Sequence, residues 1–192
     1  MARRSVPLMV SVAAAALLTS CSGTAEPAAP TTTAPASGPR VPGPLPTDSL
    51  LHDPCSILTE AEAAQVGLAY PGRPVNETSA SCSFRSSGNP LNSISIGAVP
   101  QNPHGISDIY DQKARSAYFE PVSIRGYPGA LADIHDGRTS GNCQLWVGVT
   151  DEPAVSIIPQ ISAGPNKNDP CGLAQKFAAA MIGHLKAESG RS

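Results

Sequence analysis

The chain has 192 residues with a formal net charge of −2 at pH 7, and only 15% of its residues are charged. A length of this order suits one domain with a single core and a tail. Lysine and arginine show no surplus, at 13 residues against 15 aspartates and glutamates. We therefore expect no nucleic acid among the partners of this protein.

The N-terminal segment has the features of a bacterial export signal. Arg3 and Arg4 precede an apolar segment, residues 6–18, which is shorter than the roughly 20 residues that a transmembrane helix needs. The segment ends in Leu18-Thr19-Ser20-Cys21, which resembles the lipobox of bacterial lipoproteins. This resemblance implies cleavage before Cys21 and a lipid on its thiol, whose acyl chains, such as palmitate, bind the membrane. The alternative is an ordinary cleaved signal peptide with Cys21 as a spare thiol.

Residues 22–47 consist almost entirely of Pro, Ala, Thr, Gly and Ser, and seven of these 26 positions are proline. Such a composition cannot bury enough apolar surface to offset the entropy lost on ordering. We therefore expect a signal peptide over residues 1–20, a lipidated and disordered tether over 21–47, one α+β domain over 48–188 and a disordered tail over 189–192.

The first half of the predicted domain contains two helix starts and a hairpin. Asp53-Pro54-Cys55 has the order of an N-cap followed by proline at the first helical position. Thr59 and Glu62 form a capping box that predicts a second, better helix. Alternating residues over 79–85 and 92–99, separated by a Ser-Ser-Gly-Asn-Pro turn, predict two antiparallel strands.

The second half is predicted to contain two more helices and four more strands. An apolar period of 3.6 residues predicts a middle helix over residues 106–117. Asp169-Pro170-Cys171 repeats the earlier helix start and begins a last helix with an apolar stripe that extends to Leu185. The expected fold is therefore α+β, an antiparallel sheet of about five to six strands with three helices and two disulfides. Turn residues delimit the later strands at residues 121–125, 130–135, 142–150 and 154–161, with a bend at 126–129.

Four cysteines remain once Cys21 is set aside, and outside the membrane they are most simply two disulfides. A zinc site is disfavoured because no two of them are separated by two to four residues. Sequential pairing, Cys55 with Cys82 and Cys143 with Cys171, needs the least excursion of the chain. Nested pairing, Cys55 with Cys171 and Cys82 with Cys143, stays open because the two Asp-Pro-Cys starts look like partners.

Several of these features together resemble a known family. They are the lipobox, the tether, Asp53-Pro54-Cys55-Ser56-Ile57-Leu58-Thr59-Glu60, Cys82 ahead of an aromatic strand residue, Cys143 within a strand, and Asp169-Pro170-Cys171. Over residues 21–185 the chain is similar to the actinobacterial lipoproteins grouped as domain of unknown function 3558. The resemblance implies a Gram-positive cell envelope and no established activity. Phe84 stands where tryptophan is expected.

The sequence contains no nucleophile elbow, no zinc-protease motif, no phosphate-binding glycine loop and no dinucleotide fingerprint. His104 lies four residues before Asp108, so a histidine–carboxylate pair can form there, although a solvated loop histidine is the simpler interpretation. His135 lies beside Asp133 and Asp136 at a turn. No two histidines have metal-ligand spacing, so we expect neither a metal nor a cofactor.

Trp146 lies on the strand face opposite Cys143 and Leu145. An exposed tryptophan flanked by small residues suits ligand docking, whereas the simpler interpretation is packing under the middle helix. His104 and Trp146 are therefore the two candidate ligand contacts.

The expected location is the outer face of the cytoplasmic membrane, with the lipid on Cys21 as the anchor. The first functional hypothesis is a binding module without catalytic activity, whose partner is an envelope protein or ligand. The second is a carrier that holds an apolar small molecule or lipid between sheet and helices. The third is an envelope hydrolase with a site near His104 and Asp108, or near His135.

Overall fold

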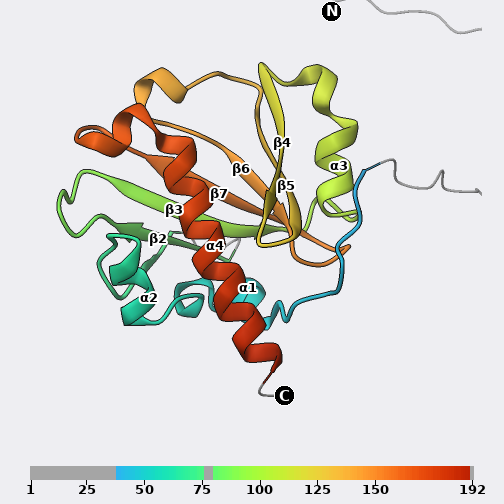
Figure 1. The fold of residues 1–192 in the computed structure, drawn as a ribbon, viewed down its shortest axis with the longest axis horizontal. Helices are drawn as coiled ribbons and strands as arrows, with labels where there is room; N and C mark the ends of the chain where they lie inside the picture. Colours follow the sequence, from blue (N-terminus) through green and yellow to red (C-terminus); the bar gives the residue numbers. More distant parts are fainter. Residues whose placement is uncertain (1–37, 76–79, 191–192) are drawn as a thin grey trace, which may run out of the picture. The chain divides into compact units, whose positions relative to one another are not determined.

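In the computed structural model, which describes residues 38–75 and 80–190, the chain forms one antiparallel sheet with helices packed on it (Figure 1). The strands are β1 (Arg73–Pro74), β2 (Ser81–Arg85), β3 (Ser93–Val99), β4 (Tyr118–Ile124), β5 (Tyr127–Asp133), β6 (Leu145–Gly148) and β7 (Ala154–Gln160). The α-helices are α1 (Asp48–His52), α2 (Glu60–Gln65), α3 (Ile106–Asp111) and α4 (Pro170–Ser189). Short 3-10 helices lie at Pro54–Ser56, Lys113–Arg115, Arg138–Ser140 and Pro165–Asn168.

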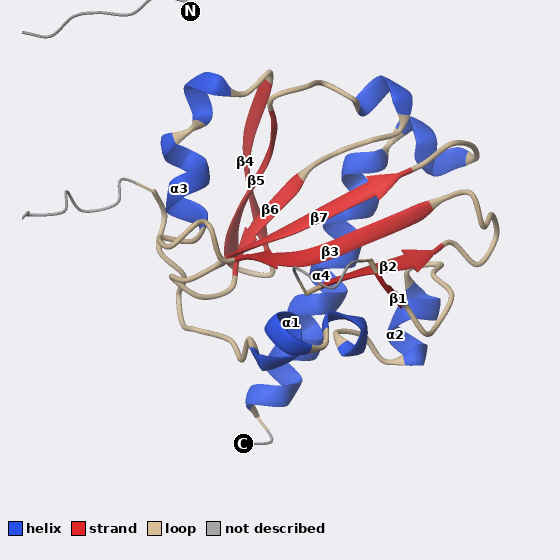
Figure 2. Ribbon diagram, turned by 180° about the vertical axis from the view of Figure 1, so that it is seen from behind, coloured by secondary structure: helices blue, strands red, loops and turns tan. Residues whose placement is uncertain are grey.

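The strands lie in the order β1-β2-β3-β7-β6-β5-β4, so two meanders meet where β3 pairs with β7. Figure 2 shows the strong twist of this sheet, in which β4 and β5 cross the direction of β3 steeply. The α+β class is confirmed, with seven strands and four α-helices in the described residues instead of five to six and three. The additional elements, β1 and α1, are only two and five residues long, too short to show a hydrophobic period.

The main core lies between one face of the sheet and α4, which crosses that face (Figure 1). The apolar stripe predicted for this helix is buried, and the ring centroids of Phe177 on α4 and Phe84 on β2 are 5.7 Å apart. On the opposite face, α3 packs over β5 and β6 through a smaller cluster. The sheet therefore has apolar side chains on both faces where helices cover it. The smaller cluster consists of Ile106, Ile109, Ala130, Ala132 and Ala154.

Two disulfides connect the sheet to the helical segments. Cys55 pairs with Cys82, and Cys143 pairs with Cys171, so the bridges follow the sequential order that the shortest chain excursion favoured. Each bridge closes a short loop, with sequence separations of 27 and 28 residues. Loops of this size restrict the unfolded chain and stabilise the fold by about 3 to 4 kcal/mol each in the chain-entropy picture.

Asp53 and Thr59 begin different kinds of helix. Asp53 precedes a three-residue 3-10 helix and makes no side-chain cap hydrogen bond. The helix predicted from Asp53-Pro54-Cys55 is therefore shorter than expected. The capping box of Thr59 and Glu62 is present in full, with the Glu62 N–H donating to Thr59 Oγ1 and the Thr59 N–H donating to Glu62 Oε2. The helix that the capping box predicts is therefore confirmed.

The middle helix is shorter than its apolar period predicts. α3 ends at Asp111, and a 3-10 helix at Lys113–Arg115 follows, where a helix to residue 117 was expected. Ala114 and Ala117 are exposed, so neither holds a helix against the sheet. The Ala117 N–H donates to the Asp133 carbonyl instead, which draws this residue into the pairing of β4 with β5.

The bend expected over residues 126–129 is also shorter. Arg125 and Gly126 adopt positive φ values of 50° and 89°, which suits a two-residue hairpin turn. β4 and β5 therefore pair up to this turn, with Ile124 opposite Tyr127. The two strands accordingly span Tyr118–Ile124 and Tyr127–Asp133 instead of 121–125 and 130–135.

The segment before α1 packs on the domain, although residues up to 47 were expected to be a disordered tether. Leu45 is buried and its N–H donates to the Val149 carbonyl, while the Tyr127 hydroxyl donates to the Gly43 carbonyl. Val41 N–H donates to Asp151 Oδ1 over 3.4 Å. The two apolar residues among the prolines, Val41 and Leu45, thus hold this segment against the domain. We call the segment, Gly38–Pro46, the strap.

Candidate ligand-binding site

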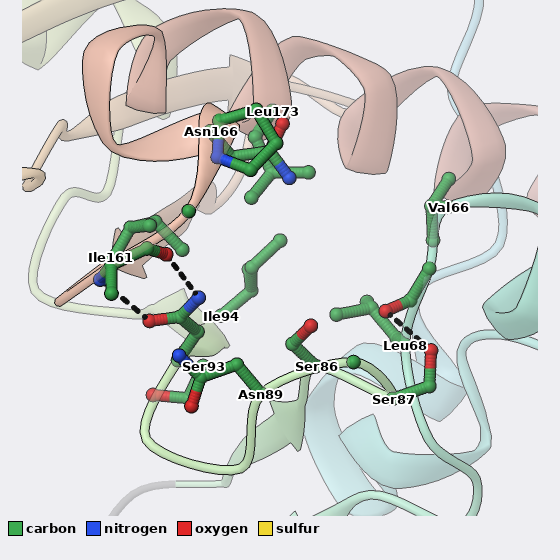
Figure 3. Close-up of a pocket in the computed structure, with 16 residues that line it drawn as sticks. Val66, Leu68, Ser86, Ser87, Asn89, Ser93, Ile94, Ile161, Asn166 and Leu173 are labelled. Carbon is green, nitrogen blue, oxygen red and sulfur yellow. Dashed lines mark hydrogen bonds between the residues drawn. The ribbon is translucent and has the colours of Figure 1, made fainter.

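A pocket of about 470 Å³ opens where the β2–β3 turn, the end of α2 and the connection from β7 to α4 meet (Figure 3). We call it the hairpin pocket. Its aliphatic floor comes from the main core, and its rim consists of small neutral residues. The floor residues are Val66, Leu68, Ile94, Ile161 and Leu173, and the polar rim residues are Ser86, Ser87, Asn89, Ser93 and Asn166.

Asn92 fixes one wall of the hairpin pocket. It is 7% exposed, and its amide Nδ2 donates to the Ala163 carbonyl over 2.8 Å. Its Oδ1 accepts from the N–H groups of Ser162 and Ala163 over 2.9 and 3.3 Å. One side chain beside β3 therefore holds the chain that leaves β7, some seventy residues later, in place.

The opposite wall is held by the end of α2. Gly67 follows the helix at a φ of 75°, a left-handed conformation that glycine adopts without steric cost. Its carbonyl accepts from both the N–H and the hydroxyl of Ser87, each over 3.0 Å. In the turn itself, Asn89 Oδ1 accepts from the Leu91 N–H. These hydrogen bonds give the pocket its shape before any ligand enters.

His184 connects α2 to α4 behind this wall. It is 8% exposed, its Nδ1 lies 2.8 Å from Glu62 Oε2, and its Nε2 lies 3.5 Å from Glu188 Oε1. Burial acts to raise the pKa of Glu62, but the hydrogen bonds from Thr59 and His184 hold that pKa below its ordinary value of 4.5. His184 thus joins the two helices, a role that only the fold shows.

None of the described residues that line the hairpin pocket carries an ionisable side chain. The hydroxyls of Ser86 and Ser93 and the side-chain amide of Asn166 make no hydrogen bond to another described residue, and Figure 3 shows Ser86 and Ile94 directed into the space. Serine needs an adjacent base to act as a nucleophile, and this lining offers none. The arrangement can hold a neutral ligand by hydrogen bonds and apolar contact.

The two ligand contacts proposed from sequence lie elsewhere, at opposite ends of α3. His104 Nδ1 is 3.0 Å from Asp108 Oδ1, and the His104 N–H donates to Asp108 Oδ2. The pair therefore forms beside the start of α3, where Gly105 is the N-cap and makes no side-chain cap hydrogen bond, and the His104 side chain is half exposed. Trp146 is half buried near the end of α3, where its Nε1–H donates to the Ala132 carbonyl over 3.0 Å. Neither residue lines the hairpin pocket.

The carboxylates near His135 serve the turn after β5. Asp133 Oδ1 accepts from the His135 N–H, and Asp136 forms a bidentate pair with Arg138. Hydrogen bonds from Arg138 lower the pKa of Asp136 to about 2. Arg138 also donates to Glu120 and lies 4.2 Å above the Tyr118 ring. The side chains of Asp133, Asp136 and Arg138 are thus already engaged in hydrogen bonds within the protein.

Three further observations bear on the predicted sites. Cys21 lies outside the described residues. Among residues 38–75 and 80–190, no cluster of three or more His, Cys, Asp or Glu side chains can hold a metal ion. Within the same ranges, no helix has the length and apolarity needed to cross a membrane.

No sequence pattern predicted that the residues of the hairpin pocket form a site. Only the Ser-Ser-Gly-Asn-Pro turn pointed to this region, and it predicted a turn without a site. The pocket walls are held together by hydrogen bonds of two single polar residues, Asn92 and Ser87. The partners of these residues are distant in sequence, so no local pattern marks them.

Comparison with known protein families identifies a match. The model of a family described as "Protein of unknown function (DUF3558)" matches residues 16–184. No curated protein and no solved structure matches the chain.

Proposed function

The chain belongs to this DUF3558 family, and on that premise we propose that it is a binding module of the cell envelope that holds a neutral ligand in the hairpin pocket. In this proposal the protein has no catalytic activity. A lipid on Cys21 anchors it to the outer face of the cytoplasmic membrane. The lipobox-like sequence and the proline-rich segment after it support the anchor and the tether.

The lining of the hairpin pocket is the observation that carries the proposal. Charged ligands bind where a counter-charge offsets the loss of hydration, and the described lining residues supply no such charge. The aliphatic floor favours an apolar group of the ligand, and the serine and asparagine rim favours a neutral polar group. A neutral amphiphile has both parts.

The position of the strap supports a pocket that faces away from the membrane. β3 begins beside the hairpin pocket, at Ser93, and ends near the strap, at Val99, while β7 runs in the opposite direction. The strap contacts the β6–β7 turn through Val149 and Asp151. The chain therefore enters the domain at the end of these strands that is remote from the pocket.

Two other functions receive less support. A carrier with its ligand between sheet and α4 needs space there, and that layer is filled by buried side chains such as Phe84, Phe177 and Met181. A hydrolase at His104 would use the His104–Asp108 pair, whose imidazole Nε2 bonds to no described residue, but neither residue lines the hairpin pocket.

Calorimetric titration of the mature full chain tests the proposal. We expect 1-monooctanoylglycerol, a neutral amphiphile, to bind with a dissociation constant in the micromolar to millimolar range, and octanoate, its charged counterpart, to bind at least about tenfold more weakly. Ser86→Phe fills the pocket and should abolish binding. Ser83→Phe, a change on the other face of the same hairpin, is the matched control.

Binding of octanoate as tight as that of the glyceride would contradict a neutral site. Equal binding to the wild type and to Ser86→Phe would place the ligand outside the hairpin pocket.

A further inference from the structure

A second pocket, of about 260 Å³, lies on the sheet face opposite α4. The end of α3 and the 3-10 helix after it form one side, through Ile109, Gln112 and Arg115. The end of β5 and the start of β6 form the other side. No residue lines both this pocket, which we call the tryptophan pocket, and the hairpin pocket.

Trp146 is held firmly in this pocket. Its Nε1–H donates to the Ala132 carbonyl, so the one polar atom of the indole is satisfied within the protein. Ala130 lies opposite Trp146 in the register of β5 and β6, and both Ala130 and Ala132 are small. The ring is packed against the α3 cluster on one side and contributes to the pocket lining on another. What it offers a ligand is therefore an apolar, aromatic surface.

Three residues with planar polar side chains, Gln112, Arg115 and Gln144, line the pocket with this ring. Arg115 is exposed and forms no ion pair with another described residue, whereas Gln112 donates through Nε2 to the Asp108 carbonyl. Asp133 also borders the pocket, but it lies opposite Tyr118 in the register of β4 and β5, so its carboxylate is on the face of the main core, away from Trp146. Gln144 donates through Nε2 to the Ser156 hydroxyl over 2.7 Å, which fixes the amide and leaves its carbonyl oxygen available.

Ile134 completes the rim of the tryptophan pocket with an aliphatic side chain. Its exposed fraction is 65%. A ligand seated on Trp146 would cover part of this surface.

We propose that the tryptophan pocket is a second binding site, which takes a single neutral sugar ring of a glycan. One face of a pyranose or furanose carries C–H groups that pack on an aromatic ring. Its hydroxyls each donate and accept, so they match the Arg115 guanidinium and the Gln144 carbonyl oxygen beside that ring. The pocket size suits one ring.

The hairpin pocket lacks this combination, because no aromatic and no charged residue lines it. A free amino acid offers a carboxylate to Arg115 and an ammonium to the Gln144 carbonyl, but a small one such as glycine or alanine presents no flat C–H face to the indole. The observations favour the sugar.

Trp146 is the only tryptophan of the chain, so its intrinsic fluorescence reports on this pocket alone. We expect galactose, arabinose, mannose or N-acetylglucosamine to change the emission of the mature full chain saturably, with a dissociation constant on the order of 1 mM for a single ring. Arg115→Ala and Gln144→Ala should each weaken this response at least about tenfold, because each removes a hydrogen-bonding partner of the sugar. Lys113→Ala removes an exposed cation two residues from Arg115 and is the matched control.

Ser86→Phe fills the hairpin pocket and should leave the sugar response intact, which keeps this test separate from that of the proposed function. Absence of any emission change with all four sugars would overturn the inference. So would a response that survives in both Arg115→Ala and Gln144→Ala, provided that far-ultraviolet circular dichroism shows them folded. A response to free glycine or alanine, with none to the sugars, would assign the pocket to zwitterions instead.

Discussion

At the scale of single residues, two polar side chains determine the walls of the hairpin pocket. Asn92 holds the connection from β7 to α4, and Glu62 holds α2 against α4 through His184. Each replaces several contacts with solvent by hydrogen bonds inside the protein, which makes each residue hard to substitute. Their effects on stability can be measured separately because they lie on different walls.

Asn92→Ala should lower the free energy of unfolding by about 2 kcal/mol, because it removes three hydrogen bonds to Ser162 and Ala163. Urea denaturation followed by circular dichroism measures the change. Asn89→Ala, in the same turn, removes one hydrogen bond at an accessible position and should cost less than about 1 kcal/mol. Equal losses in the two variants would show that Asn92 does not hold the wall.

Glu62 gives stability a pH dependence of known sign. Its pKa is lower in the folded protein than its ordinary value of 4.5, so ionised Glu62 stabilises the fold above that value, and the contribution is lost as the pH falls through the folded pKa. We expect Glu62→Gln to be less stable than the wild type at neutral pH, with the difference shrinking at about pH 3. Urea midpoints at both pH values test this. A difference that grows on acidification would mean that the pKa is raised instead.

At the scale of elements, the strap shows how a proline-rich segment becomes part of the domain. Its composition predicts disorder, yet Leu45 is buried and hydrogen bonds join the segment to Tyr127 and Val149. One buried leucine and a few backbone hydrogen bonds outweigh the local composition there. α3 shows the reverse case, in which a helical period continues in the sequence after the helix has ended at Asp111.

Leu45→Ala should lower the free energy of unfolding by about 2 kcal/mol, the low end for a buried leucine, because the site lies near the surface. The exposed neighbour Pro44 provides the control, and Pro44→Ala should change stability by less than about 0.5 kcal/mol. Thermal or urea unfolding distinguishes them. If Leu45→Ala unfolds like the wild type, the strap does not contribute to the domain.

At the scale of the whole molecule, patterns that act locally could be predicted and contacts between distant residues could not. The capping box of Thr59 and the apolar stripe of α4 follow from spacing along the chain, and the sequential disulfide pairing is one of the two that the spacing left open. β1 pairs with β2 over only two residues, and the site depends on Asn92 meeting Ala163. Neither leaves a periodic signal, because a single long-range contact has no pattern in the sequence.

The proposed anchor makes a prediction at this scale. Cys21→Ala should move the protein from the membrane fraction to the culture medium, because it removes the thiol that would carry the lipid. Immunoblots of both fractions, with mass spectrometry of the mature N-terminus, measure this. Wild-type protein with an unmodified N-terminus would contradict the anchor.

The most direct test of the binding proposal is an amide chemical-shift titration of the labelled mature chain with 1-monooctanoylglycerol. The proposal predicts that the shifts concentrate at Gly67, Ser86, Asn92 and Ala163, and that they vanish in Ser86→Phe. Shifts confined to other parts of the described chain, or none at all, would contradict a neutral-ligand site in the hairpin pocket.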